Sequence, residues 1–131
     1  MHGYKENIEE LTLENDNFRK VLYTAPHLQL VLMSLKVGED IGLETHTDND
    51  QFFRIESGEG KCKIDNNEYP IKDGDAIIVP AGAKHNIINT GNTPLKLYTI
   101  YAPPHHQDGI LRITKQDAER NDESFKGKTT E

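Results

Sequence analysis

The stretch from Gly74 to Asn89, GDAIIVPAGAKHNIIN, constrains the fold more than any other part of the chain. An apolar run leads to Pro80 and Gly82, and a second run begins directly after His85. The apolar runs predict two strands, and the proline and glycine predict a tight turn between them. His85 is therefore expected at the start of the returning strand, where a strand fixes its direction and the turn leaves room for a small molecule. For a single histidine without further partners, a simpler interpretation is favoured, in which His85 is partly buried and bonded to a backbone carbonyl.

The same alternation of short apolar segments and turn-forming residues continues through the rest of the chain. Aliphatic, aromatic and β-branched residues form short segments separated by glycine, proline and asparagine, which is typical of strands. The predicted strands cover residues 18–24, 28–37, 42–46, 51–56, 61–65, 68–71, 76–79, 86–88 and 95–102, with a hairpin turn at Asn66-Asn67. The segment 28–37 is largely apolar and predicts a strand covered on both faces, although a buried helix has the same pattern. Many short strands predict an all-β sandwich or barrel.

The 131 residues suit one domain with a single core. The expected parts are a polar N-terminal arm over residues 1–17, a barrel over residues 18–113, and a short helix with a polar tail over residues 114–131. The arm is expected to hold a short helix from about Lys5. Thr114 and Asp117 have the spacing of a helix cap, so a C-terminal helix is predicted there. From Asn121 the sequence is polar, and we expect a disordered tail.

Composition narrows the class of partner. Lys and Arg number 15 against 22 Asp and Glu, a formal net charge of -7, and no basic cluster stands out. Nucleic acids and anionic membranes are therefore disfavoured as partners. The single cysteine, Cys62, cannot form an internal disulfide, and no apolar run approaches the length of a membrane span. We expect a cytoplasmic protein whose partner is a small molecule.

A second group of polar residues lies between Gly38 and Gly58. Glu44 and His46 are two residues apart on a predicted strand, so their side chains leave the same face. Gln51 occupies the otherwise apolar face of the next strand. If these faces line a barrel, a carboxylate, an imidazole and a carboxamide converge near its mouth. His85 is expected to reach them from a strand across the barrel.

This set of side chains has the chemistry of a metal site. It offers oxygen and nitrogen atoms without a thiolate, which suits a divalent transition metal such as Zn, Mn, Fe or Ni and argues against a structural zinc of the cysteine type. Glu44, His46 and His85 alone form the two-histidine, one-carboxylate set associated with non-haem iron. Gln51 is then a fourth, neutral ligand or a hydrogen-bonding neighbour of the ligands. A carboxylate facing a barrel interior would be costly without a cation.

These residues resemble the two sequence motifs of the cupins. The second motif is met in full by Gly74, Pro80, Gly82, His85 and Asn89. The first is met in spacing by Gly38, Glu44, His46, Gln51 and Gly58. Glu44 stands where the family usually has histidine and Gln51 where it usually has glutamate, so one carboxylate remains. The resemblance covers about residues 30–102 and implies a double-stranded β-helix, the jelly-roll barrel of cupins.

The resemblance also suggests a function. Mixed sets of His, Glu and Gln are similar to those of phosphomannose-isomerase-like cupins, which implies an isomerase-like, metal-dependent enzyme acting on a sugar or a keto or enol compound. One alternative is a non-haem Fe(II) dioxygenase in which Gln51 is detached. Another is a non-enzymatic barrel that binds or senses a small molecule. Small cupins commonly form dimers, so a homodimer is expected, and no catalytic residue is assigned.

Two further pairs of residues receive a structural interpretation. His105 and His106 are adjacent on an extended segment, where neighbouring side chains point in opposite directions. A surface location is therefore predicted for both. Tyr98 and Tyr101 lie on opposite faces of one predicted strand, and one of them is expected to line the cavity.

Overall fold

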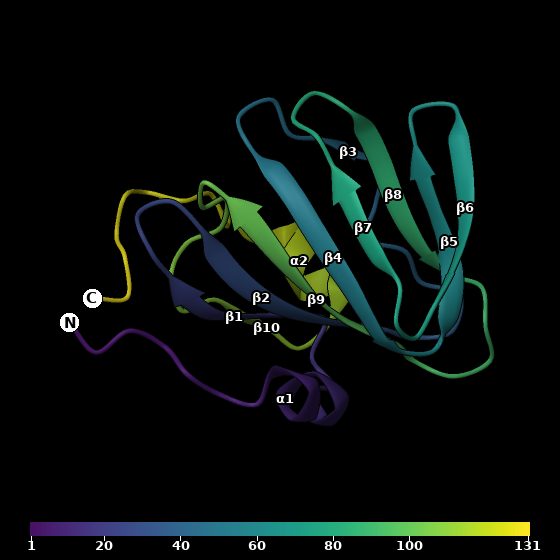
Figure 1. Ribbon diagram of the computed structural model, residues 1–131, viewed down its shortest axis with the longest axis horizontal. Coiled ribbons are helices and arrows are strands. Elements are labelled where there is room, and N and C mark those ends of the chain that lie inside the picture. The colour runs from purple at the N-terminus through teal and green to yellow at the C-terminus, as the bar shows by residue number, and fades with distance from the viewer.

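The computed structural model describes residues 1–131, and its centre is a pair of antiparallel β-sheets packed face to face (Figure 1). The strands are β1 (Arg19–Thr24), β2 (Gln29–Leu35), β3 (Glu44–Thr45), β4 (Asp50–Ser57), β5 (Glu59–Ile64), β6 (Asn67–Lys72), β7 (Ala76–Val79), β8 (Lys84–Asn89), β9 (Leu95–Ala102) and β10 (Leu111–Arg112). The helices are α1 (Ile8–Glu14) and α2 (Lys115–Arg120). One sheet has the strand order β10-β1-β2-β9-β4-β7 and the other β3-β8-β5-β6. The predicted all-β jelly roll is confirmed.

Alternation along the strands builds the core between the sheets. In the six-stranded sheet, Phe53 and Ile55 of β4 and Leu97 of β9 are completely buried, and the side chains between them point outward. Cys62 and Ile87 cover them from the four-stranded sheet. Burying each large apolar side chain contributes about 1.5–3 kcal/mol. The apolar segment that sequence alone allowed as strand or helix is the buried strand β2.

Both helices begin at side-chain caps. Asn7 Oδ1 accepts the backbone N–H of Glu10 at 3.0 Å, and Thr114 Oγ1 accepts that of Asp117 at 3.1 Å. The predicted C-terminal helix is therefore confirmed as α2. Neither helix has the length and apolar character that crossing a membrane requires.

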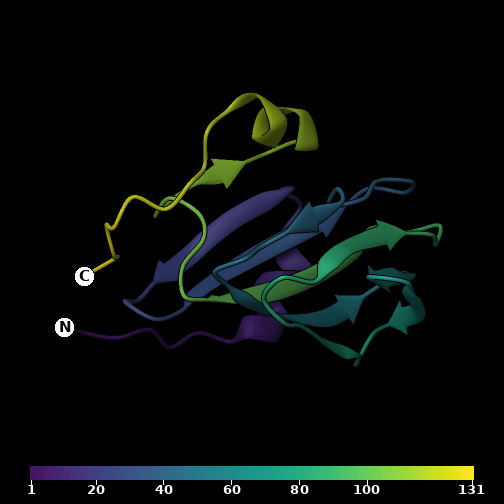
Figure 2. The same ribbon diagram turned by 90° about the horizontal axis from the view of Figure 1, so that it is seen from above.

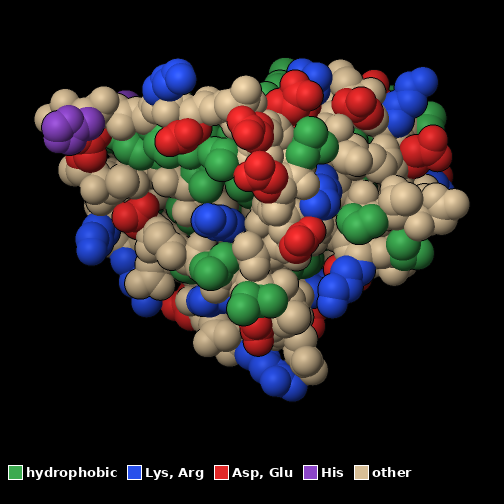
Figure 3. All heavy atoms as spheres, turned by 90° about the horizontal axis from the view of Figure 1, so that it is seen from below, with side chains coloured by type: hydrophobic (Ala, Val, Ile, Leu, Met, Phe, Trp, Pro, Cys, Tyr) green, Lys and Arg blue, Asp and Glu red, His purple; other side chains and the backbone are tan.

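Acidic and basic side chains are interspersed over the face of the molecule seen in Figure 3, so neither sign of charge dominates that face.

The segment from β10 to α2 lies on one side of the sandwich (Figure 2). β10 pairs with β1 at the edge of the six-stranded sheet. The ammonium group of Lys115 in α2 forms an ion pair with Asp40, which precedes β3 at the edge of the four-stranded sheet. The segment therefore covers the side where these two sheet edges face each other.

The tail after Asn121, which sequence analysis predicts to be disordered, packs against the barrel. Glu123 is only 8% exposed and forms an ion pair with Arg19 of β1. Ser124 forms an antiparallel bridge with His106. A polar composition predicts disorder because it offers little apolar surface to bury, but this tail is held by a buried charge. The two chain ends lie side by side in Figure 1.

The hairpin of β5 and β6 turns one residue earlier than predicted. Ile64 pairs with Asn67, so the turn residues are Asp65 and Asn66. Asp65 has a φ of 50°, a conformation that short polar side chains tolerate. Its carboxylate also accepts the backbone N–H of Lys84 at 3.0 Å, which ties the turn to β8.

Two glycines with the same backbone conformation allow a matched test of packing. Gly58 and Gly74 both have a φ of 93°, but a Cβ at Gly58 would lie 2.6 Å from the carbonyl oxygen of Pro94, whereas a Cβ at Gly74 would meet nothing within 4 Å. We expect Gly74→Ala to lower the free energy of unfolding by about 1–2 kcal/mol, from conformation alone. Gly58→Ala should cost about 1–3 kcal/mol more, because the backbone must also move. Urea denaturation measures both, and equal losses would contradict the assigned contact.

Candidate metal centre

The pairing of β3 with β8 creates the site. Glu44 of β3 is directly opposite His85 of β8, which places their side chains on the same face of the sheet. His46 follows Glu44 by two residues and leaves that face as well. One ligand atom from each of the three side chains lies within 4.8 Å of the others. The structure thus brings together three of the four predicted site residues, although His85 comes from the neighbouring strand and not from across the barrel.

Hydrogen bonding directs one nitrogen of His85 into the site. Its Nδ1 lies 3.1 Å from the carbonyl oxygen of Ala83, and donation there leaves a lone pair on Nε2. The carbonyl bond of the simpler interpretation therefore exists, but it uses only one of the two ring nitrogens.

Two imidazole nitrogens of the site have no hydrogen-bond partner. They are Nε2 of His85 and Nε2 of His46, and both are buried. Oε2 of Glu44 is 3.0 Å from Nε2 of His46, a close ion-pair contact that is not counted as a hydrogen bond. Buried polar atoms without partners are costly. A cation among the three side chains would satisfy both nitrogens and the carboxylate, so the residues present fit a metal ion.

The environment keeps Glu44 charged. Burial is the largest influence on this carboxyl group and raises its pKa, but the contact with His46 and the positive field of Arg19 together outweigh it. The net result is a pKa below the usual value of glutamic acid. Glu44 is therefore available as an anionic ligand.

Gln51 faces the same interior from β4. Its side chain is 3% exposed and lies opposite Tyr101 of β9. Nε2 donates to Oγ1 of Thr99 at 3.0 Å, while Oε1 is buried without a partner. An amide oxygen is a suitable neutral ligand for a divalent ion. Its role as fourth ligand stays a prediction.

His106 is buried and His105 is half-buried against the site, so the predicted surface location of the pair is wrong. The ring centroid of His105 is 4.1 Å from that of His46, and its ring stacks on Tyr101 at 5.2 Å. His106 is 6% exposed, and its Nε2 lies 3.1 Å from the Tyr101 hydroxyl. Tyr101, not Tyr98, is thus the tyrosine that lines the site. The alternation argument failed because these histidines follow β9 on an irregular segment.

Gln29 holds this segment inward. Its Oε1 accepts the backbone N–H groups of His105 and His106 at 3.2 and 2.9 Å, and its Nε2 donates to the His106 carbonyl at 2.7 Å. Gln29 is completely buried at the start of β2. A polar residue inside an apolar stretch was the signal in the sequence that could have revealed this contact, because buried amides need partners.

A buried ionic cluster adjoins the histidines. Oε1 of Glu123 lies 2.6 Å from Nη1 of Arg19 and 3.4 Å from Nδ1 of His106. Oε2 of Glu123 lies 3.2 Å from Nε of Arg112. The carboxylate of Glu123 thus connects β1, β10 and the segment after β9 that contains His106. Sequence analysis missed this cluster, because its members are isolated in the sequence.

A small cavity opens beside Glu44 and beneath α2. Its volume is about 150 Å³. The lining residues are Phe18, Arg19, Ile41, Glu44, Lys115, Ala118 and Glu119. The cavity therefore reaches the candidate metal centre through one of its three side chains.

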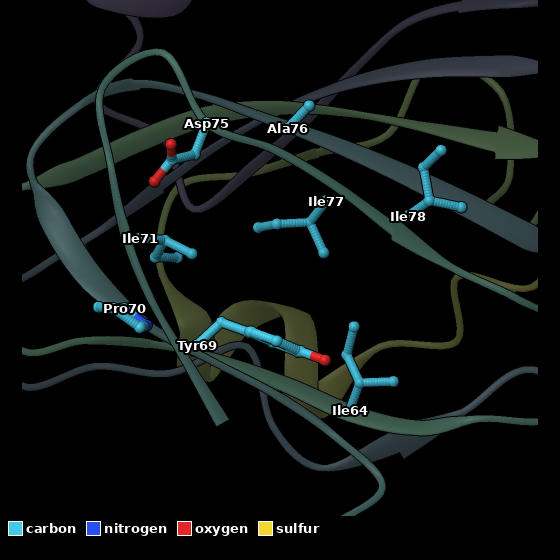
Figure 4. Close-up of a pocket in the computed structure, with 8 residues that line it drawn as sticks. All are labelled: Ile64, Tyr69, Pro70, Ile71, Asp75, Ala76, Ile77 and Ile78. Atoms are coloured by element: carbon cyan, nitrogen blue, oxygen red, sulfur yellow. The ribbon is translucent and has the colours of Figure 1, made fainter. Parts of the chain in front are cut away.

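A larger hollow of about 370 Å³ lies elsewhere, between β6 and β7 at the opposite edges of the sheets (Figure 4). Most of its lining is apolar, including Tyr69 and Ile77. Its one acidic residue, Asp75, already accepts the backbone N–H of Lys72. This hollow contains none of the convergent ligand atoms, so it is not part of the metal centre.

Removing the Glu123 carboxylate tests the ionic cluster. Glu123→Ala leaves two guanidinium groups facing each other without compensation, and we expect the free energy of unfolding to fall by about 3–5 kcal/mol. Glu119→Ala removes a carboxylate that is 65% exposed and should change it by less than about 0.5 kcal/mol. Chemical denaturation of both variants is the measurement. A similar small loss in both would show that the buried pair does not hold the tail.

The buried histidines predict loss of stability in acid. Burial lowers the pKa of His85, His105 and His106 below the usual 6.5, and that of His105 to about 4. The unfolded chain therefore binds more protons than the folded one below pH 6.5, so the free energy of unfolding falls as pH falls. His105→Gln should make this dependence shallower in metal-free protein between pH 6.5 and 4. The exposed His27, changed to Gln, is the control; equal slopes for wild type and His105→Gln would contradict the assignment.

Comparisons with known proteins agree with this geometry. Residues 31–101 match the family model described as a cupin domain. The chain is 53% identical over 118 residues to the uncharacterized protein YrkC of Bacillus subtilis, covering 86% of the chain and 63% of YrkC. The chain thus spans less than two thirds of the length of that relative.

Two further proteins are similar to this chain, one over almost its whole length and the other over about half of it. The crystal structure of BH2720 from Bacillus halodurans matches with a TM-score of 0.89 and 46% identity, covering 92% of this chain and 98% of that one. An oxalate-binding protein of Thermotoga maritima is 35% identical over 68 residues, 52% of this chain and 56% of that protein. The match of the family model spans both motifs from Gly38 to Asn89. With the jelly roll and the clustered Glu44, His46 and His85, it establishes that this chain belongs to the cupin family.

Proposed function

We propose that this protein is a metal-dependent enzyme that acts on a small oxygenated compound. Glu44, His46 and His85 hold a divalent transition metal, with Gln51 as the fourth ligand. The observation that supports this most strongly is the convergence of three ligand atoms within 4.8 Å, with both Nε2 atoms buried and unpartnered. When bound, the metal supplies a Lewis acid that polarises a carbonyl or hydroxyl oxygen.

The surrounding residues have separate roles in this proposal. The Ala83 carbonyl fixes the tautomer of His85, and the lowered pKa of Glu44 keeps its carboxylate ionised. The imidazole of His105 is partly exposed beside His46 and stays neutral, because burial lowers its pKa to about 4. A neutral imidazole can accept a proton from a substrate and return it, as an isomerisation requires. His105 is therefore the proposed acid–base group.

Metal analysis tests the site. Protein purified without a tag should contain about one transition metal per chain, and His46→Ala or His85→Ala should abolish binding, because each removes one of two imidazole ligands. His27→Ala changes an exposed histidine outside the cluster and should retain the metal. Elemental analysis gives the stoichiometry and circular dichroism verifies folding. Full metal content in both His46→Ala and His85→Ala would contradict the proposal.

A second candidate is a non-haem Fe(II) dioxygenase. It is favoured by the two-histidine, one-carboxylate set of Glu44, His46 and His85, with Gln51 outside the ligand set. Oxygen uptake after anaerobic Fe(II) loading, across diketones, flavonoids and thiols, separates it from the first candidate. Absence of uptake would exclude oxygenation of these substrates.

A non-enzymatic barrel is the third candidate, supported by the relative named an oxalate-binding protein. Thermal stabilisation by a small molecule without any turnover would favour it. The homodimer and the cytoplasmic location stay predictions.

A further inference from the structure

We infer that Arg19 binds a carboxylate of the substrate, so that the ligands of this centre are small carboxylic acids. The inference rests on the proposed metal site and names the class of compound that it takes. Arg19 belongs to β1 and lines the cavity that also touches Glu44. Arg19 and Glu44, one of the three side chains of the metal centre, thus border one small space.

Arg19 has an unused donor in that environment. The residue is 6% exposed, and its Nε is buried without a hydrogen-bond partner. Glu123 occupies only Nη1. A guanidinium presents its donors in a planar fork that matches a carboxylate. A buried donor without an acceptor is costly, and an incoming carboxylate oxygen would satisfy it.

The other charged residues of the cavity do not compete for this role. Lys115 is paired with Asp40, so its charge is already balanced. Glu119 lies at the outer rim, with its side chain 65% exposed. Arg19 and Arg112 together share the single carboxylate of Glu123, and a divalent ion exceeds the charge of Glu44. The buried surroundings are therefore net positive and favour an anion.

The cavity is large enough for a small anion. Its volume is about 150 Å³. A carboxylic acid of two to four carbons, such as a 2-oxo acid, fits such a space, and Arg19 would bind its carboxylate. Among the compounds of the proposed function, the charge of Arg19 thus favours keto acids over uncharged sugars.

The test compares pyruvate with butanedione, its uncharged isostere, on Co²⁺-loaded protein. Isothermal titration calorimetry gives the affinity of each ligand for the wild type, Arg19→Lys and Arg112→Lys. Arg19→Lys keeps a positive charge for Glu123 but loses the fork. It should weaken pyruvate binding by about tenfold to a hundredfold, the range expected for a charge-assisted hydrogen bond. Butanedione binding and the visible spectrum of bound Co²⁺ should not change.

Arg112→Lys is the matched control, because it also alters an arginine bound to Glu123 but does not line the cavity. It should bind pyruvate like the wild type. Equal pyruvate affinity in the wild type and Arg19→Lys, or an equal loss in Arg112→Lys, would overturn the inference. If Arg19→Lys does not fold, the wild type decides: stronger binding of pyruvate than of butanedione supports the inference, and equal or no binding of pyruvate overturns it. Failure of the wild type to bind Co²⁺ would instead contradict the metal site itself.

Discussion

The centre of this protein depends on a two-residue strand. β3 consists of Glu44 and Thr45, and its pairing with β8 places Glu44 opposite His85. Because side chains alternate along a strand, the same pairing aims His46 at that point while Thr45 faces outward. A shift of one residue would turn all of these side chains to the other face. The register of this short pair therefore decides whether a metal site exists.

The surroundings of the site come from distant parts of the chain. Gln29 turns the two histidines after β9 inward, and Glu123 ties the C-terminal tail to β1 and β10. Each of these contacts pairs a buried polar group that would otherwise be costly. Their combined effect is to cover one side of the barrel while a small cavity stays open beside Glu44.

Much of the fold could be predicted from the sequence because its signals are local. Glycine and proline mark the turns, and alternation marks the strands, so the predicted segments correspond closely to β1 through β9. The two-residue spacing of Glu44 and His46 predicted that they share a face, and the resemblance to the cupin motifs implied that His85 joins them. The hairpin turn was misplaced by one residue because Asp65 and both asparagines tolerate a positive φ.

The interior positions of His105, His106 and Glu123 could not be predicted in the same way. Alternation applies to strands, and the two histidines follow one on an irregular segment. Glu123 and Arg19 are 104 residues apart, so no local pattern connects them. The tail after Asn121 has the polar composition of a disordered segment, although one of its carboxylates is buried. Such contacts appear only once the fold has brought the segments together.

The most direct test of the central claim is anomalous diffraction from crystals grown with Co²⁺ or Mn²⁺. The account predicts one anomalous peak at about 2.0–2.2 Å from Nε2 of His46, Nε2 of His85 and a carboxylate oxygen of Glu44. A peak bound elsewhere, or crystals in which these three side chains bind no ion at saturating metal, would contradict it.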